Sequence, residues 1–305
     1  KKSFVFYEAL GTILIIAPWN APFTLSLIPI ISAILAGNTV IYKPSEIAAY
    51  SGMLIEKILK ESNVEPGIVT VVYGKGSEIG DVLIEGKPDK IFFTGSTATG
   101  KIIMEKAGKH LIPVEMELGG KDPMIIFEDA FIERAVNAAV WGSLFNCGQV
   151  CVSIERIYVQ ESICDDFVNQ VVEQVKNVKQ GWDTKGEFDI GCLASQDQMK
   201  IVEDQINDAK QKGAKILIGG KRKGKTLFFE PTVIVNVDHS MKLMQEETFG
   251  PILSIMKFTT EDEVVKLAND SVFGLNASVW TKDKVKALRV SRKLITGGVS
   301  VNNAL

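Results

Sequence analysis

Short apolar runs alternate with amphipathic stretches along the first part of the chain, and this alternation predicts the fold. Residues 11–17 form a continuous apolar run rich in β-branched side chains, which is typical of a strand buried on both faces. Residues 48–61 repeat apolar side chains at helical spacing, and Ser45 is a good helix cap before them. Further strand-like runs cover residues 39–42, 68–73, 90–94 and 111–118. Because strands alternate with helices, we expect right-handed crossovers and a parallel sheet.

The same alternation restarts after Lys121 and continues to the end of the chain. We expect strands over residues 124–127, 154–160, 216–218, 232–237, 252–258, 277–281 and 298–302. We expect helices over residues 131–144, 162–179, 198–212, 261–269 and 284–294. Gly119 and Gly120 lie between the two series of alternating strands and helices. The sequence therefore predicts two α/β domains, residues 11–119 and 120–305.

Several loops of the first domain follow strands directly, and ligands of parallel sheets bind at that carboxyl edge. Two prolines fix a turn after the first strand, and this turn presents Trp19 and Asn20. Glycine-rich loops at residues 74–80 and 95–100 each open a predicted helix, an arrangement that suits a phosphate group. Neither loop is a strict G-x-G-x-x-G, and tight turns alone also explain such glycines.

Composition narrows the class of protein without naming a function. The chain has 305 residues, 46% of them hydrophobic, and a formal net charge of -3, which is an ordinary globular balance. The mild acidity predicts no nucleic-acid or membrane partner, and no apolar run reaches transmembrane length. Four cysteines without disulfide spacing suit a reducing compartment, so we expect a cytoplasmic protein. Both ends look like interior positions of a longer chain.

Cys151 occupies a helix-to-strand transition in the stretch Phe-Asn-Cys-Gly-Gln-Val-Cys-Val, which begins at residue 145. A loop carried on rigid elements is a common place for chemistry. The alternative is inert packing, because free cysteine is among the most buried residue types. Glu115 and Glu117 share one face of the strand at 111–118, which indicates either a solvated face or an approach to an active site.

Six motifs, in order, resemble the signatures of the aldehyde dehydrogenases. They are Pro18-Trp19-Asn20, Lys43-Pro44-Ser45-Glu46, Phe93-Thr94-Gly95-Ser96-Thr97, Glu117-Leu118-Gly119-Gly120-Lys121, Gly148-Gln149-Val150-Cys151 and Glu246-Glu247-Thr248-Phe249-Gly250-Pro251. The resemblance covers essentially all 305 residues. It implies a Rossmann-type NAD-binding domain over residues 11–119 and a catalytic domain over residues 120–305. It also implies that residues 1–10 end an oligomerisation arm, and that the parent protein is a homodimer or homotetramer.

The resemblance implies three catalytic roles. Cys151 would be the nucleophile that attacks the aldehyde carbon and forms a thiohemiacetal, which is oxidised to a thioester. The side-chain amide of Asn20 and the backbone N–H of Cys151 would stabilise the alkoxide. Glu117 would activate the water that hydrolyses the thioester, with a pKa suited to that task by partial burial. The presence of Glu117 favours release of a free acid over transfer to coenzyme A.

By the same resemblance the cofactor is NAD, with NADP as the alternative. Lys43 and Glu46 would hold the adenosine ribose, and Glu46 would repel a 2′-phosphate. Ser96 would contact the pyrophosphate. The remaining candidate contacts are Trp19, Ser45, Gly76 and Gly95 in the first domain and Gln198, Glu247 and Phe249 in the second. No metal site is expected, since the two histidines lack partners at ligand spacing.

The substrate is expected to be apolar, because Ala21 stands where many family members carry an aromatic residue. Leu25 and Ile28 lie on the face of the following helix. A wide apolar tunnel would suit a long-chain or aromatic aldehyde. A semialdehyde dehydrogenase for a small charged substrate and a non-catalytic protein of the same fold are the alternatives. Cys147 is expected to be packing, with a redox partnership with Cys151 as the sharper alternative.

Overall fold

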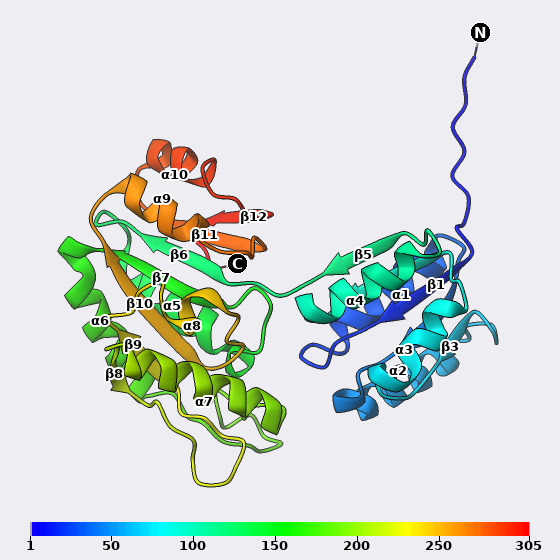
Figure 1. Ribbon diagram of the computed structural model, residues 1–305, viewed down its shortest axis with the longest axis horizontal. Coiled ribbons are helices and arrows are strands. Elements are labelled where there is room, and N and C mark those ends of the chain that lie inside the picture. The colour runs from blue at the N-terminus through cyan, green and yellow to red at the C-terminus, as the bar shows by residue number, and fades with distance from the viewer. Residues whose placement is uncertain (1, 305) are drawn as a thin grey trace. The chain divides into compact units, whose positions relative to one another are not determined.

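The computed structural model describes residues 2–304. The chain forms two compact units, residues 1–118 and 119–305, and each is described by itself. Residues 2–10 form no helix or strand and are exposed to solvent (Figure 1). None of the helices in the described part of the chain is long and apolar enough to cross a membrane.

The first unit is a five-stranded parallel sheet with the strand order β3-β2-β1-β4-β5. Its strands are β1 (Thr12–Ile16), β2 (Thr39–Lys43), β3 (Val69–Val71), β4 (Lys90–Thr94) and β5 (Val114–Glu117). Its helices are α1 (Thr24–Leu35), α2 (Ala49–Glu61), α3 (Gly76–Glu85) and α4 (Thr97–Gly108). The order reverses beside β1, which is the Rossmann-type arrangement. The predicted parallel α/β fold is confirmed.

Alternation along β1 explains why helices cover both faces of this sheet. Ile13 and Ile15 belong to a buried cluster that also contains side chains of α1 and α2. Leu14 points the other way and joins a cluster with side chains of α3 and α4. Leu14 and Ile15 are both fully buried, as expected for a strand with no solvent face.

The second unit is a seven-stranded sheet with the order β12-β11-β6-β7-β10-β9-β8, parallel throughout except for β8. Its strands are β6 (Asp122–Ile126), β7 (Ile154–Gln160), β8 (Lys215–Ile218), β9 (Thr232–Val235), β10 (Ile252–Phe258), β11 (Asn276–Trp280) and β12 (Gly298–Val301). Its helices are α5 (Ile132–Leu144), α6 (Glu161–Lys176), α7 (Gln196–Gln211), α8 (Lys242–Gln245), α9 (Glu261–Asn269) and α10 (Lys284–Ser291).

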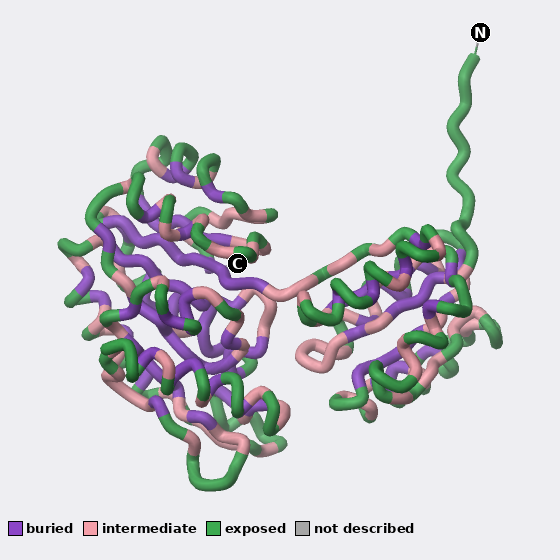
Figure 2. The backbone as a smooth tube through the Cα atoms, in the orientation of Figure 1, coloured by how far each residue is buried: buried purple, intermediate pink, exposed green. Residues whose placement is uncertain are grey.

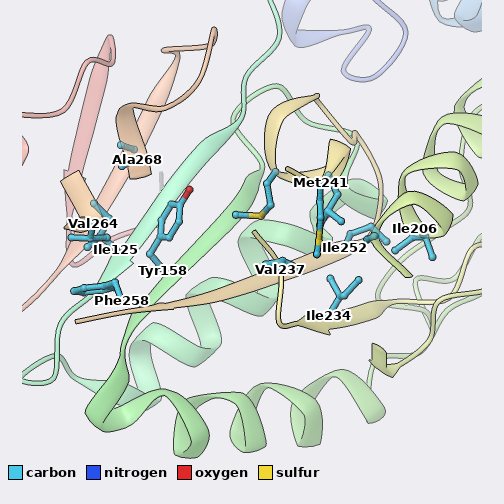
Figure 3. Close-up of a cluster of buried hydrophobic side chains, with 14 of the residues drawn as sticks. Ile125, Tyr158, Ile206, Ile234, Val237, Met241, Ile252, Phe258, Val264 and Ala268 are labelled. Atoms are coloured by element: carbon cyan, nitrogen blue, oxygen red, sulfur yellow. The ribbon is translucent and has the colours of Figure 1, made fainter. Parts of the chain in front are cut away.

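Two hydrophobic clusters lie on the two faces of this larger sheet. One contains Ile125, Tyr158 and Ile252 from three strands, packed with side chains of α7 and α9 (Figure 3). The other contains side chains of α5 and α6 packed against the same strands. The buried backbone of β6, β7 and β10 runs through the centre of the unit (Figure 2). These three strands form a rigid support for the loops at their ends.

Most predicted elements are found within a few residues, and two predicted strands are shorter than expected. The strand expected over 111–118 begins at Val114, because Leu111 has a φ of 56° and cannot be extended. The strand expected over 68–73 is only β3, Val69–Val71. The short helix α8 and the 3₁₀ turn η2 (Phe145–Gly148) were not predicted, since neither is long enough to show a helical period.

Candidate active site

In the first unit, the predicted site residues gather at the carboxyl ends of the strands. Trp19 and Asn20 follow β1 and are half-buried, and Glu117 is the last residue of β5. The backbone N–H of Gly95, which follows β4, donates to the carbonyl oxygen of Glu117 at 3.0 Å. Glu117 is exposed, so the partial burial expected for it is not found. The reason is its place at the end of an edge strand, on the face that it shares with exposed Glu115.

Lys43, Glu46 and Gly76 form one connected cluster although they come from three segments. The Lys43 side chain is buried, and its Nζ lies 2.9 Å from Glu46 Oε2. The Gly76 N–H donates to Glu46 Oε1 at 3.4 Å. Burial alone would raise the pKa of Glu46, but the bonds from Lys43 and Gly76 lower it below its ordinary value. An ionised carboxylate fixed at this edge suits the hydroxyl groups of a ribose.

Two predicted serines cap helices. Ser45 precedes η1 (Glu46–Ala48), and its hydroxyl accepts the N–H of Ile47 at 3.3 Å, so it caps this 3₁₀ turn and not the predicted helix, α2, whose N-cap is Ala48. Ser96 caps α4 and accepts the N–H of Thr99 at 3.2 Å. The N-terminus of α4 carries free N–H groups and the positive end of the helix dipole, which suits a phosphate.

In the second unit, Cys151 lies on a loop with unusual backbone geometry. Asn146, Cys147 and Gly148 have φ values of 51°, 60° and 72° in succession. Only glycine adopts such values without strain, and Gly148 also lies directly against the carbonyl of Gly250, with no room for a Cβ. The side-chain amide of Gln149 stabilises this loop. Its Nε2 donates to the carbonyl oxygens of Asn146 at 3.0 Å and Cys192 at 3.2 Å. Its Oε1 accepts the N–H of Ala194 at 2.8 Å.

The two thiols of this loop have different surroundings. Cys147 is 1% exposed within the hydrophobic core, and burial raises its pKa to about 12. That environment favours the packing interpretation of Cys147 over a redox role. Cys151 is half-buried. Burial raises the pKa of its thiol, the charges of Asp122 and Glu247 raise it further, and a bond from the Val152 backbone opposes them.

Glu247 lies over the glycine pair that begins the second unit. Its Oε1 accepts the N–H of Gly120 at 3.1 Å. A Cβ on Gly119 would lie 2.5 Å from Glu247 Oε2, so a larger residue at this position would displace the Glu247 carboxylate. A Cβ on Gly120 would collide with the carbonyl of Cys151. Gly120 therefore brings the thiol loop and Glu247 together. Burial, helped by the charge of Glu155, raises the pKa of Glu247 to about 7.

The segment from Glu247 to Phe249 is held by bonds to its backbone. Glu155 accepts the N–H of Thr248 at 2.7 Å and the N–H of Phe249 at 2.8 Å. Lys121 Nζ lies 2.5 Å from the same carboxylate, and both side chains are buried. Burial lowers the pKa of Lys121, and the contact with Glu155 acts in the opposite direction.

The side-chain amide of Gln198 binds the backbone of the same segment. Its Nε2 donates to the carbonyls of Thr248 at 2.8 Å and Phe249 at 3.1 Å. Phe249 itself has a φ of 49°. The predicted cofactor contacts Gln198, Glu247 and Phe249 are thus brought together, and Gln198 is engaged in fixing the backbone of the other two.

The site of the second unit lies at the amino ends of the parallel strands. Gly120 precedes β6, Cys151 precedes β7 and Phe249 precedes β10. The rule that ligands bind at carboxyl ends therefore describes the first unit and not the second. The thiol loop lies here because a helix-to-strand connection reaches a parallel sheet at its amino edge.

Sequence reasoning missed three buried charged residues beside this loop, namely Asp122, Glu155 and Arg156. Arg156 donates from Nε to the carbonyl of Lys121 at 2.8 Å and from Nη2 to the carbonyl of Ala268 at 2.8 Å. The available signal was a Glu-Arg pair inside an otherwise apolar strand, next to the thiol motif. Such a pair in a buried strand must have partners, and these partners define the site.

His239, which lies near this network, is held by two neighbouring side chains. His239 Nε2 lies 2.9 Å from the hydroxyl of Tyr158, and its Nδ1 lies 2.6 Å from Asp270 Oδ2. Within residues 2–304, no group of three or more His, Cys, Asp or Glu side chains is arranged to hold a metal ion.

A Rossmann-type unit is followed by an α/β unit that carries a cysteine loop beside a half-buried glutamate. This combination indicates a two-domain class of nucleotide-binding protein. The model of the aldehyde dehydrogenase family matches residues 1–305, so the chain belongs to the aldehyde dehydrogenase family. The resemblance expected from the six motifs is confirmed.

Curated relatives and solved structures agree with this assignment. The chain is 43% identical over 295 residues to a 4,4'-diapolycopene aldehyde oxidase from Methylomonas sp, covering 97% of this chain and 55% of that protein. A Mycobacterium tuberculosis protein named for succinate semialdehyde and NADP(+) is 38% identical over 303 residues, covering 99% of this chain and 58% of that protein. The betaine aldehyde dehydrogenase of Staphylococcus aureus, solved in complex with NAD+, is 40% identical with a TM-score of 0.94, covering 97% of this chain and 60% of that chain. The chain thus spans somewhat more than half the length of these relatives.

Proposed function

We propose that the protein carrying this chain oxidises an apolar aldehyde to the carboxylic acid with NAD, using Cys151 as the nucleophile. The observation that carries the proposal is the meeting of the Cys151 loop and Glu247 at Gly120, in a chain of the aldehyde dehydrogenase family. A half-buried thiol next to a half-buried carboxyl group, on a backbone fixed by internal bonds, is a preorganised site.

Each proposed role uses a group described above. The Cys151 thiolate sulfur bonds to the aldehyde carbon, and the Cys151 N–H donates to the resulting alkoxide. By the family motif, the Asn20 amide would donate to it as well. NAD, when bound, supplies the acceptor for the hydride that leaves this carbon. Glu117 removes a proton from the water that cleaves the thioester, which releases the acid and restores the thiol.

The residues present fit NAD. Glu46 is ionised and tied to Lys43 and Gly76, so it can accept bonds from ribose hydroxyls and would repel a 2′-phosphate. Ser96 and the N-terminus of α4 suit the pyrophosphate. Glu247 and Phe249 are proposed to hold the nicotinamide ribose and the nicotinamide ring. Trp19, Ser45 and Gly95 are further proposed cofactor contacts by their motifs.

An apolar substrate is supported by α1 and by one relative. Helix α1 carries no charged side chain, Leu25 is half-buried, and Ile28 is 60% exposed. The relative from Methylomonas is named for a polyene aldehyde. The alternative, a small charged semialdehyde, is favoured by the name of the Mycobacterium relative, but it requires a cationic side chain near the aldehyde.

The test is NADH or NADPH production by the full-length protein with decanal, benzaldehyde, acetaldehyde and succinate semialdehyde. We expect the highest kcat/KM with NAD and decanal or benzaldehyde. Cys151→Ala should lower the rate below about 10⁻³ of wild type, whereas Cys147→Ala, the matched control four residues away, should keep most of it. Equal loss in both variants, or a preference for succinate semialdehyde, would count against the proposal.

A second measurement examines Glu117. Glu117→Gln should still give a rapid burst of about one NADH per site, followed by slow turnover, because the thioester forms but is not hydrolysed. Absence of the burst would assign Glu117 to an earlier step.

We also infer a homo-oligomer. Residues 2–10 expose Phe4, Phe6 and Tyr7 by 73%, 83% and 96%, which suits an arm that packs on a second copy. Light scattering of the full-length protein should give a dimer or tetramer, and removal of this segment should reduce the order of assembly.

A further inference from the structure

Asp122 is a buried carboxyl group next to the thiol loop, and no role described so far uses it. It is the first residue of β6 and is 3% exposed. Its Oδ1 accepts the N–H of Asn276 at 3.3 Å. Its Oδ2 is buried and has no hydrogen-bond partner among the described residues. An ionised carboxylate with one oxygen unpaired in a buried place is costly, whereas a neutral acid is tolerated there.

Gly120 connects this carboxyl group to the nucleophile. A Cβ on Gly120 would lie 2.8 Å from Asp122 Oδ1 and would also collide with the carbonyl of Cys151. The carboxyl group and the backbone of Cys151 therefore lie against the same small residue. The charge of Asp122 acts on the Cys151 thiol, and charges interact more strongly in a partly dry site than in water.

The charged groups around Asp122 come from several segments. Glu155 and Arg156 of β7 and Glu247 of the loop before β10 act on it electrostatically. The two glutamates disfavour a charge on Asp122, and Arg156 favours one. Lys121, the preceding residue, is already paired with Glu155 at 2.5 Å. The negative groups and the burial together favour the neutral acid.

We propose that Asp122 controls the ionisation of the Cys151 thiol. As a neutral acid it leaves the thiolate free to form, and as a carboxylate it opposes the thiolate by like-charge repulsion. Asp122 is a positioning residue in this scheme, because it acts only through Cys151 and does not touch the aldehyde. The thiol proton leaves to solvent in both cases. The inference rests on the proposed role of Cys151 as nucleophile.

The direction of the effect follows from the order of the two ionisations. Burial raises the pKa of Asp122 to about 8. Burial also raises the pKa of Cys151, and Asp122 adds to that rise. At pH 6 the carboxyl group is neutral and has no effect on the thiol. At pH 9 it is charged, and the thiolate fraction is reduced.

The test measures alkylation of Cys151 by iodoacetamide in the whole chain, followed by mass spectrometry of the peptide that contains it. In this reaction the thiolate sulfur bonds to the methylene carbon and iodide leaves, so the rate reports the thiolate fraction. No cofactor or aldehyde is needed. The measurement therefore stands even if the protein fails to oxidise aldehydes.

Asp122→Asn keeps the shape and the acceptor for Asn276 but cannot become charged. We expect its Cys151 to react at the wild-type rate at pH 6 and about tenfold faster than wild type at pH 9, the effect of one unit in thiol pKa. Asp122→Ser, a second neutral variant, should show the same rise if the amide variant fails to fold. Asp262→Asn is the matched control, because that carboxylate is 92% exposed. It should leave the rate unchanged at both pH values.

A purely structural role for Asp122 would change the rate by the same factor at pH 6 and pH 9. That outcome, or a rate ratio at pH 9 of one or less in both neutral variants, would overturn the proposal.

Discussion

The ion pair between Lys121 and Glu155 offers the sharpest test of how the second unit is held together. Both side chains are buried, at 0% and 4% exposed, with Nζ and Oε2 2.5 Å apart. Glu155 also accepts two backbone N–H groups, from Thr248 and Phe249. Breaking a buried pair by removing one partner leaves an uncompensated charge and costs about 3–5 kcal/mol. Glu155→Gln should therefore lower the free energy of unfolding of the second unit by about 4 kcal/mol.

The assay is urea unfolding of the chain, with amide hydrogen exchange along β7 to assign the loss to the second unit. The matched control is Glu161→Gln, because Glu161 lies 2.7 Å from Lys257 in an exposed pair, with 52% and 65% of the side chains accessible. Such a surface pair contributes about 0–1 kcal/mol. A loss below about 1 kcal/mol for Glu155→Gln, equal to the control, would refute the reasoning.

A double variant measures how much the charges of Lys121 and Glu155 stabilise each other. Lys121→Met with Glu155→Leu removes both charges, so no unpaired charge remains. It should cost less than the sum of Lys121→Met and Glu155→Leu measured alone. An additive result would mean that the two charges do not stabilise each other.

Three further predictions concern neighbouring residues. Gly148→Ala should destabilise the chain by at least about 3 kcal/mol in urea unfolding, since a Cβ would meet the carbonyl of Gly250 at a φ of 72°; wild-type stability would contradict this geometry. Cys147 should resist iodoacetamide at pH 8 while Cys151 reacts, because burial raises the Cys147 pKa to about 12; equal labelling in native protein would show that the loop opens. Burial raises the pKa of Asp122 from an ordinary 3.8 to about 8. The contribution of Asp122 to the free energy of unfolding is therefore complete below pH 3.8. It falls by up to about 1.4 kcal/mol per pH unit as the pH rises toward 8. Asp122→Asn should therefore gain stability relative to wild type between pH 5 and pH 8, and a constant difference across that range would contradict the assignment.

The sequence was sufficient to predict most elements, for reasons seen in particular strands. β7 and β10 are found with the predicted bounds, because each is a mostly apolar stretch, apart from the Glu155-Arg156 pair of β7, between clear helix and turn signals. The sequence also singled out Cys151, Glu247 and Phe249 by motif, and the structure brings these segments together at Gly120 and Glu155. Asp122 and Glu155 were not predicted as site residues. Their importance depends on neighbours that lie far away in sequence, such as Asn276 and Thr248.

Local patterns determined the alternation of strands and helices, the turn capped by Ser45 and the motif that contains Cys151, because these depend on residues within a few positions of one another. The tertiary structure alone decided the electrical environment of that cysteine. Which charges surround Cys151, and which of them are buried, depends on how the starts of β6, β7 and β10 meet at one edge of the sheet. Burial and charge act through space, so a reading along the chain cannot supply them.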